Sequence, residues 1–190
     1  MLFLGIYKMN DLSLYILDIA QNSIAAKASI IEIIIEENAS KNLLSLTIKD
    51  NGIGMTKEII SKVTDPFFTT RNTRTVGLGI PFLKMASNLA EGELTIDSTL
   101  GLGTSIEATF KLNHINTPPL GAIEETLFLL MIHPELKDLK YNHVVDDSTF
   151  TFNLGTINSI LDGVPLTEPS IMTYLKSYIK DNIINLRRTL

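Results

Sequence analysis

The stretch Ser29-Ile-Ile-Glu-Ile-Ile-Ile-Glu36 is dominated by β-branched isoleucine, which predicts a central strand of a β-sheet. In residues 44–49, 94–96 and 106–112, apolar side chains alternate with polar ones. This alternation is typical of strands that bury only one face. Strands of a fully buried parallel sheet are apolar throughout, so the pattern favours a mixed, mainly antiparallel sheet with helices on one face. The sequence therefore predicts an α/β (α+β) sandwich.

Helical patterns flank these strands. Residues 11–26 carry apolar side chains at helical spacing, and Asn10 or Asp11 can cap this helix. Two further helices are predicted at residues 56–63 and 80–89. The expected helices thus alternate with the strands along the chain.

The pattern changes after Pro118-Pro119. Residues 122–132 are predicted to be helical, residues 141–154 to form a hairpin, and residues 168–186 to form an amphipathic helix capped by Thr167. The expected parts are an N-terminal extension (1–10), a main domain (11–113) and a small C-terminal α+β unit (114–190).

Composition excludes several classes of protein. The chain has 190 residues, a net charge of −5, a mean hydropathy of +0.21 and no cysteine. No apolar stretch approaches the ~20 residues of a membrane-spanning helix, so membrane insertion is not expected. The lack of cysteine excludes thiol catalysis and disulfides, and it fits a cytoplasmic location. An acidic chain without a Lys/Arg cluster is not expected to bind nucleic acid.

Small polar residues and glycines lie where the predicted elements end. Asp18 and Asn22 are four residues apart, so they share one helix face. An amide oxygen suits Mg²⁺, and a carboxylate can orient or deprotonate a water. Asp50 precedes Gly52 and Gly54, which let backbone approach a flat ligand while the carboxylate accepts from an exocyclic amine. A solvated helix face and a plain turn are the alternatives.

Two more glycine pairs and a polar loop follow. Gly77-Leu78-Gly79 leads into a helix, whose first N–H groups can bind an anion. The preceding loop carries Arg71 and Arg74, which suit a lid over phosphates. Gly101-Leu-Gly103-Thr104 places a hydroxyl beside a tight turn. A solvated loop and a hairpin turn explain these segments equally well when each is taken alone.

In their order and spacing, these motifs resemble the GHKL superfamily of ATP-binding proteins, which includes gyrase, heat-shock chaperones, MutL-type mismatch-repair proteins and histidine kinases. Residues 17–29 resemble the N box of the MutL type, whereas Phe68-Thr-Thr-Arg71 is similar to the kinases, including serine kinases that act as anti-sigma factors. The resemblance covers about residues 11–112 and implies the Bergerat-type ATP-binding fold.

The resemblance also implies the ligands, ATP and Mg²⁺, and the role of each matching residue. Asn22 would bind Mg²⁺, Asp50 would recognise the adenine amino group, and Asp18 would be the catalytic base. The remaining residues would shape the purine pocket, the phosphate loop or the ATP lid: Gly52, Gly54, Arg71, Arg74, Gly77, Leu78, Gly79 and Thr104.

The sequence departs from the superfamily at two positions. Thr75 stands where the phosphate loop usually begins with glycine, and Asp18 stands where hydrolytic members carry Glu. A catalytic group displaced by about 1 Å can cost on the order of a hundredfold in rate. We therefore expect slow intrinsic hydrolysis.

Two functions remain open from the sequence. One is a Mg-ATP-dependent enzyme, either a slow ATPase or a kinase of a partner protein in regulation. The alternative is a nucleotide-responsive binding module, without significant turnover, whose lid gates partner binding. His114, His133 and His143 lack the context of a phosphoacceptor, so we expect packing or surface roles for them. Residues 114–190 are expected to contact a partner protein or a second copy of the chain.

Overall fold

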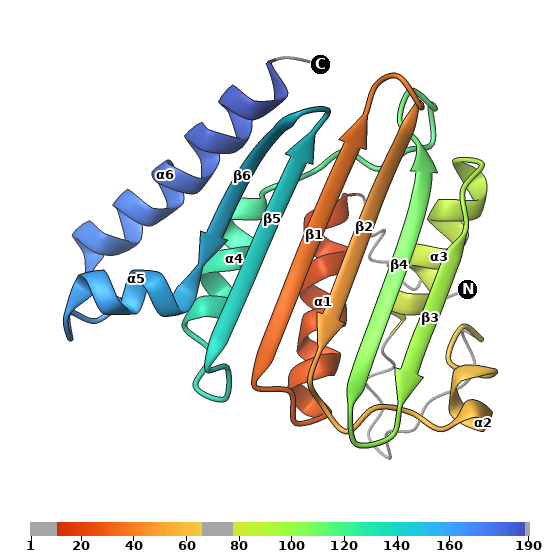
Figure 1. Cartoon of the computed structure of the whole chain (residues 1–190), viewed down its shortest axis with the longest axis horizontal. Helices are drawn as coiled ribbons and strands as arrows, with labels where there is room; N and C mark the ends of the chain where they lie inside the picture. The colour runs from red at the N-terminus through yellow and green to blue at the C-terminus, as the bar shows by residue number, and fades with distance from the viewer. Residues whose placement is uncertain (1–10, 66–77, 189–190) are drawn as a thin grey trace, which may run out of the picture.

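The computed structural model describes residues 11–65 and 78–188 and contains one six-stranded sheet, ordered β3-β4-β2-β1-β5-β6 (Figure 1). The strands are β1 (Ile30–Asn38), β2 (Leu43–Asp50), β3 (Leu94–Thr99), β4 (Gly103–Lys111), β5 (Asp138–Val145) and β6 (Ser148–Asn153). β1 and β5 are parallel, and all other neighbouring strands are antiparallel. The sheet is therefore mixed and mainly antiparallel, which confirms the predicted fold class.

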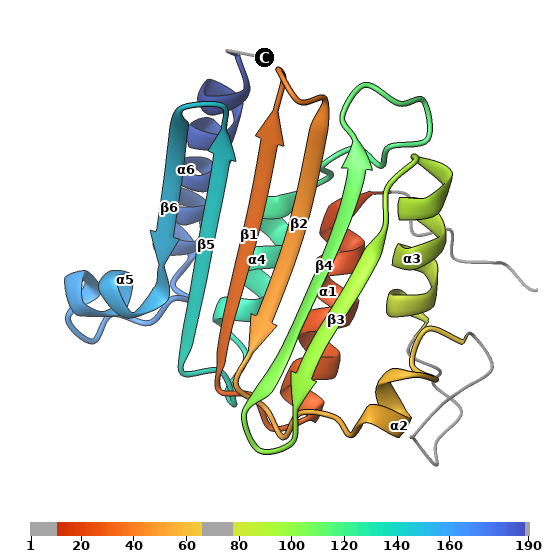
Figure 2. The same ribbon diagram turned by 45° about the vertical axis from the view of Figure 1, so that its right-hand side comes forward.

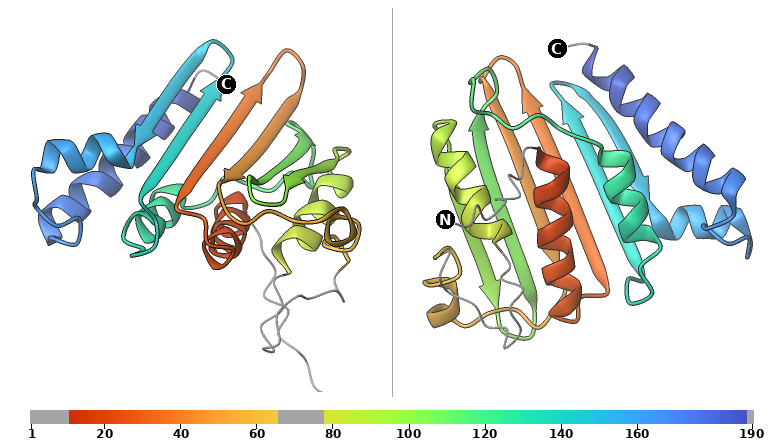
Figure 3. Two further views of the ribbon diagram at one scale, coloured as in Figure 1. Left: turned by 60° about the horizontal axis from the view of Figure 1, so that its bottom comes forward. Right: turned by 180° about the vertical axis from the view of Figure 1, so that it is seen from behind.

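The helices are α1 (Leu12–Ala25), α2 (Lys57–Ile60), α3 (Gly79–Leu89), α4 (Ile123–Met131), α5 (Leu154–Leu161) and α6 (Pro169–Arg187). α1, α3, α4 and α6 lie on one face of the sheet, as the view from behind in Figure 3 shows. Figure 2 shows α5 projecting from the edge formed by β6. None of the helices in the described ranges is long and apolar enough to cross a membrane.

The alternation in β1 explains why the helices pack on only one face of the sheet. Ile31, Ile33 and Ile35 are fully buried beneath the helices, whereas Glu32 and Glu36 point to the opposite face. Burying an isoleucine side chain stabilises the fold by about 1.5–3 kcal/mol. A register shift of one residue would exchange the two faces, so this strand fixes the register of the sheet.

The C-terminal strands continue the same sheet. β5 pairs with β1 over eight residue pairs, from Ile30↔Asp138 to Glu37↔Val145. One hydrophobic core contains residues from both parts of the chain, including Ile33 of β1, Tyr141 of β5 and Ile179 of α6. The boundary at residue 113 stays a prediction, but no break in the sheet or core marks it.

Two local expectations were wrong. The hairpin pattern predicts strand up to Leu154, but the chain turns into α5 there, because the Asn153 side chain accepts from the Thr156 N–H at 2.8 Å and caps the helix. Glu168 rather than Thr167 caps α6, its carboxylate accepting from the N–H groups of the first turn. Pro169 follows it at the first helical position, where its missing N–H costs nothing.

Candidate functional site

Most of the predicted site residues that the structure describes meet at one end of the sheet. They come from the middle and C-terminal part of α1, the end of β2, the first turn of α3 and the turn between β3 and β4. The end of β2 and the turn between β3 and β4 lie toward the lower end of Figure 1. Because β2 and β4 are antiparallel neighbours, Thr104 lies directly opposite Asp50 in the register. Segments up to 86 residues apart in sequence, Asp18 and Thr104, therefore reach one end of the fold.

Asp50 is held at both carboxylate oxygens by neutral donors. The Ser23 hydroxyl donates to Oδ2 at 2.7 Å, and the Gly52 N–H donates to Oδ1 at 2.8 Å. Each carboxylate oxygen can accept a second hydrogen bond, so the group keeps acceptor capacity in a fixed orientation. An exocyclic amine is the kind of donor that such a carboxylate can bind.

The surrounding loops pack backbone against backbone and need glycine. Gly54 has a φ of +67°, and an added Cβ would lie 2.1 Å from the Thr99 carbonyl oxygen. A Cβ on Gly103 would lie 2.0 Å from the carbonyl oxygen of Asp50. A side chain at either position would push the loops apart. The loops therefore form a rigid wall beside Asp50.

A second serine ties these loops together. Ser98 accepts from the Met55 N–H at 2.8 Å, donates to the Gly103 carbonyl oxygen at 2.9 Å and lies 2.9 Å from the Thr104 hydroxyl. Thr104, which is predicted to support the purine pocket, is thus itself held by a hydrogen bond with Ser98. Ser98 occupies a position that faces the helices, where the alternation of β3 calls for an apolar residue.

Asp18 connects α1 to the start of α3. Its Oδ2 accepts from the Asn22 side-chain amide at 3.2 Å and from the Gly79 N–H at 3.1 Å. A Cβ on Gly79 would lie 2.1 Å from the same oxygen, so only glycine admits this contact. Leu78 is the N-cap of α3 and makes no side-chain capping bond. Asp18 and Asn22 therefore stand beside the helix terminus that was predicted to bind phosphates.

The donor set fits Mg²⁺ only together with a phosphate ligand. Within residues 11–65 and 78–188, no cluster of three or more His, Asp and Glu side chains could hold a metal alone. Mg²⁺ commonly keeps several waters and binds through one or two protein oxygens plus substrate phosphates. Asn22 beside the α3 terminus matches that arrangement. Arg71, Arg74, Thr75 and Gly77 lie outside the described residues.

Sequence reasoning missed Ser23 and Ser98. Ser23 is 5% exposed and falls on the apolar face of α1, one turn from Ile19. A polar side chain on a buried face needs a hydrogen-bond partner, and this pattern is the signal that could have revealed it. The same reasoning applies to Ser98 in β3.

A buried polar cluster lies at the opposite end of β1. Glu37 Oε1 is 2.8 Å from His143 Nε2 and 2.8 Å from Arg187 Nε, and the Glu37 and His143 side chains are fully buried. The Tyr141 hydroxyl lies 2.9 Å from His143 Nδ1. Burial raises the pKa of Glu37, but the His143 hydrogen bond and the Arg187 charge outweigh it, so the pKa lies below its usual value. His143 is therefore a fully buried member of a hydrogen-bonded cluster.

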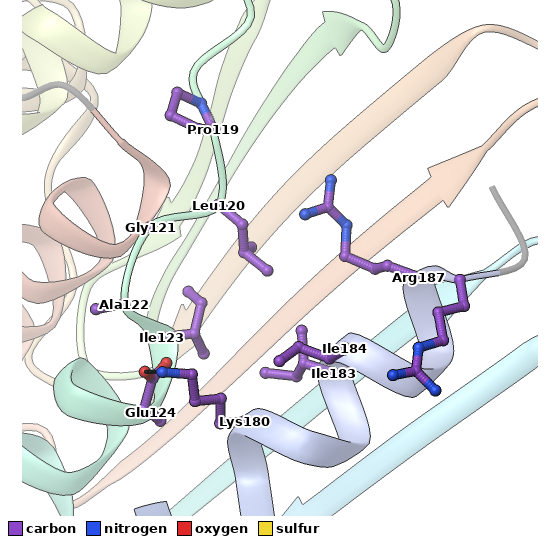
Figure 4. Close-up of a pocket in the computed structure, with 11 residues that line it drawn as sticks. Pro119, Leu120, Gly121, Ala122, Ile123, Glu124, Lys180, Ile183, Ile184 and Arg187 are labelled. Atoms are coloured by element: carbon purple, nitrogen blue, oxygen red, sulfur yellow. Dashed lines mark ion pairs between the residues drawn. The ribbon is translucent and has the colours of Figure 1, made fainter. Parts of the chain in front are cut away.

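A groove of about 610 Å³ lies between the segment that leads into α4 and the last turns of α6 (Figure 4). Ile123 and Ile183 form part of its walls, and Lys180 pairs with Glu124 at 3.6 Å across it. None of the predicted site residues within the described ranges lines this groove. It is therefore separate from the site built around Asp50 and Asp18.

A model of the histidine kinase-, DNA gyrase B- and HSP90-like ATPase family matches residues 8–114, and the chain belongs to this family. The family assignment confirms the resemblance that the motifs predict. It supports ATP as the ligand of the main domain.

Individual relatives match over this part of the chain. The histidine protein kinase SaeS of Staphylococcus epidermidis (strain RP62A) is 37% identical over 87 residues, which cover 43% of this chain and 24% of the kinase. Sporulation kinase C of Bacillus subtilis (strain 168) is 31% identical over 105 residues, covering 54% of this chain and 24% of the kinase. The chain thus matches about a quarter of the length of these kinases.

A solved structure extends the likeness of fold. The N-terminal domain of a DNA repair protein superposes with a TM-score of 0.51 and 14% identity, covering 74% of this chain and 51% of that one. At this identity the likeness concerns the fold alone. It reaches beyond half of the chain, in keeping with a sheet that continues past residue 113.

Proposed function

We propose that this chain binds Mg-ATP between α1 and α3 and either hydrolyses it slowly or transfers its γ-phosphate to a partner protein in regulation. The observation that carries the proposal is that α1 contacts both ends of the site. Its Ser23 fixes Asp50 together with Gly52, and its Asp18 accepts from the Gly79 N–H at the start of α3. The Asp50 carboxylate suits a nucleobase that carries an amino group. Asp18 lies beside the start of α3, and a helix N-terminus is a site that can bind phosphates. The ATPase family supports ATP over other nucleotides.

In this proposal the base is recognised at the end of β2. Asp50 accepts a hydrogen bond from the 6-amino group of adenine, whereas guanine would present a carbonyl oxygen and repel the carboxylate. Gly52 and Gly54 allow the backbone to approach the ring plane. Thr104, opposite Asp50, supports this wall.

The phosphates are bound at the other end. The first N–H groups of α3 would face the phosphates, and the Gly79 N–H would exchange its present acceptor, Asp18 Oδ2, for a phosphate oxygen. Gly77 and Leu78, which precede Gly79 in the sequence, are proposed to belong to the same phosphate loop. Asn22 would hold Mg²⁺, which neutralises phosphate charge when bound. Arg71 and Arg74 are proposed lid residues that would close over the phosphates.

Asp18 is the proposed catalytic base. It would take the proton from a water or from a hydroxyl of the partner while that oxygen bonds to the γ-phosphorus and ADP leaves. Its Oδ2 is held by Gly79 and Asn22, so its reach is limited. Slow turnover is the expected consequence.

Calorimetry tests the proposal. Mg-ATP titrated into the protein should bind, Mg-GTP should bind much more weakly, and Asp50→Asn should weaken only the ATP complex. Asp18→Asn should keep ATP binding and lower phosphate release. If wild-type protein takes up no Mg-ATP, the proposal fails. If Asp18→Asn turns over at the wild-type rate, the base is another group.

A second candidate is a nucleotide-responsive binding module with no significant turnover. The observation that favours it is that Asp18 Oδ2 already accepts two hydrogen bonds. Incubation with γ-labelled ATP and candidate partners separates the two functions. Label on a partner, or free phosphate, supports the enzyme, and ATP-dependent partner binding with neither supports the module.

The partner is proposed to be a protein, or a second copy of the chain, that contacts residues 114–190. α6 exposes large side chains there, with Tyr174 64% and Ile184 44% accessible. Light scattering with and without Mg-ATP tests for a second copy. A nucleotide-dependent change in mass supports it, and a constant monomer mass leaves only the protein partner. We also propose a cytoplasmic location, which the lack of cysteine in the sequence supports.

A further inference from the structure

We infer that Ser23 is a positioning residue that fixes the Asp50 carboxylate for the 6-amino group of a purine, so that the site selects adenine nucleotides. The inference rests on the proposed function and deepens it. Ser23 lies within residues 17–29, which resemble the N box, but the resemblance gives a role there only to Asp18 and Asn22. Its assignment comes from its place in the fold.

The first observation is the geometry of the contact. Ser23 lies on α1 and Asp50 at the end of β2, 27 residues later, and the hydroxyl oxygen is 2.7 Å from Oδ2. A carboxylate only accepts hydrogen bonds, so the Ser23 hydroxyl must be the donor. Donation to an ionised acceptor is stronger than a neutral hydrogen bond. Ser23 therefore sets the rotation of the Asp50 side chain.

The second observation is the burial of the donor. Ser23 is only 5% exposed, so Asp50 is the partner that satisfies its hydroxyl group inside the protein. The Gly52 N–H alone holds one oxygen and leaves the carboxylate free to pivot about that bond. With Ser23 present both oxygens are bound. A ligand amine then meets a carboxylate that is already oriented, which reduces the entropy lost on binding.

The third observation is the position of Ser23 next to Asn22. The same turn of α1 carries the proposed Mg²⁺ ligand, whose amide donates to Asp18 at 3.2 Å. A single helix turn thus sets both the base end and the phosphate end of the site. Movement of this turn would disturb both ends together.

Another serine on α1 provides a matched control. The Ser13 hydroxyl donates to Asp11 Oδ1 at 2.6 Å, and Ser13 is 3% exposed. Both serines are buried on one helix and bond to an aspartate, but Ser13 lies at the opposite end of α1 from the site. Any loss of helix stability should be common to both substitutions, so it cannot explain a change in binding that only Ser23→Ala causes.

The experiment compares Ser23→Ala with Ser13→Ala in the full chain. Calorimetry measures the binding of Mg-ATP and of the Mg complex of purine riboside triphosphate, which lacks the 6-amino group. Ser23→Ala should weaken ATP binding about tenfold, which corresponds to about 1.4 kcal/mol, and leave the binding of the analogue unchanged. Ser13→Ala should alter neither.

The outcomes are distinct. Equal weakening of both nucleotides by Ser23→Ala, or no weakening at all, overturns the inference while ATP binding by the wild type upholds the proposed function. No binding of ATP by the wild type means that the proposed function itself fails. Should Ser23→Ala not fold, Ser23→Cys is measured in the same way, because a thiol is only a weak donor.

Discussion

Asp50 and Glu37 are carboxylates on neighbouring strands that both face the helices, yet their surroundings differ. Asp50 lies opposite Ile31, and Glu37 lies six residues further along β1, a separation of about 20 Å at 3.3 Å per residue. Neutral donors, Ser23 and Gly52, bind Asp50. Glu37 instead contacts an imidazole and a guanidinium, from His143 and Arg187.

The difference separates a carboxylate that can take a ligand from one that holds the fold together. A guanidinium cancels the charge of Glu37 and occupies its acceptor sites, and the side chain is fully buried. No cationic partner of Asp50 is found among the described residues, so its charge stays available to an incoming amine. The two carboxylates thus differ in the charge of their partners.

The largest effect expected from this comparison is a loss of folding stability when the cationic partner of Glu37 is removed. Arg187→Ala leaves the Glu37 carboxylate buried with only His143 beside it, and we expect the free energy of unfolding to fall by about 3 kcal/mol. Urea denaturation measures this loss. Arg188→Ala, an exposed neighbour in the same turn, should change stability by less than about 0.5 kcal/mol. Equal losses in the two variants would mean that helix fraying, not the ion pair, matters.

Asp50→Asn gives the next effect, on binding rather than stability. Losing a hydrogen bond to a charged group costs about 1.5–3 kcal/mol, so ATP affinity should fall by roughly 10–150-fold. The control is Glu37→Gln, which should lower stability and leave ATP affinity unchanged. Calorimetry and urea denaturation of both variants give the full comparison. An ATP affinity that depends equally on both carboxylates would contradict it.

Tyr141→Phe should have a smaller effect. In the neutral tautomer with the proton on Nε2, His143 donates to Glu37 and accepts from the Tyr141 hydroxyl, so every buried partner is satisfied. Removing the hydroxyl leaves Nδ1 without its donor, and stability should fall by about 1 kcal/mol. Thermal unfolding followed by circular dichroism measures it. An unchanged midpoint would mean that a water replaces the hydroxyl.

The smallest expected effect is on the pH dependence of stability, to which Glu37 contributes. Its pKa is lowered in the folded protein, so its contribution is complete above the usual value of 4.5 and is lost as the pH falls through the folded pKa. The stability difference between wild type and Glu37→Gln should therefore stay constant at neutral pH and shrink in acid. Urea denaturation at about pH 7 and pH 3 tests this. A gap that widens in acid would contradict the sign.

Periodicity was enough to predict most of the fold. The isoleucine run and the alternating strands predicted a sheet with one covered face, because those patterns follow directly from which side chains must be buried. They did not predict that β5 would pair with β1. That pairing joins residues more than 100 positions apart, and nothing local in Tyr141–Val145 specifies its neighbour.

Part of the site could be anticipated because its motifs follow the order of the superfamily that they resemble. That resemblance named Asp18, Asn22, Asp50 and Thr104; the structure brings them to one end of the fold, their roles stay predictions, and the family assignment supports the ligand. Ser23, Ser98 and the Glu37 cluster could not, because their partners come from other elements. A polar residue on a buried face indicates that a hydrogen-bond partner exists but does not identify that partner.

The Glu37–Arg187 pair can form only after the end of α6 has been synthesised. The two residues are 150 positions apart, and at 5–20 residues per second roughly 8–30 s separate their appearance during synthesis. Until the last helical turn of α6 is made, the strand at the centre of the sheet holds a carboxylate without its cation. The first half of the chain therefore reaches full stability only after Arg187 has been made.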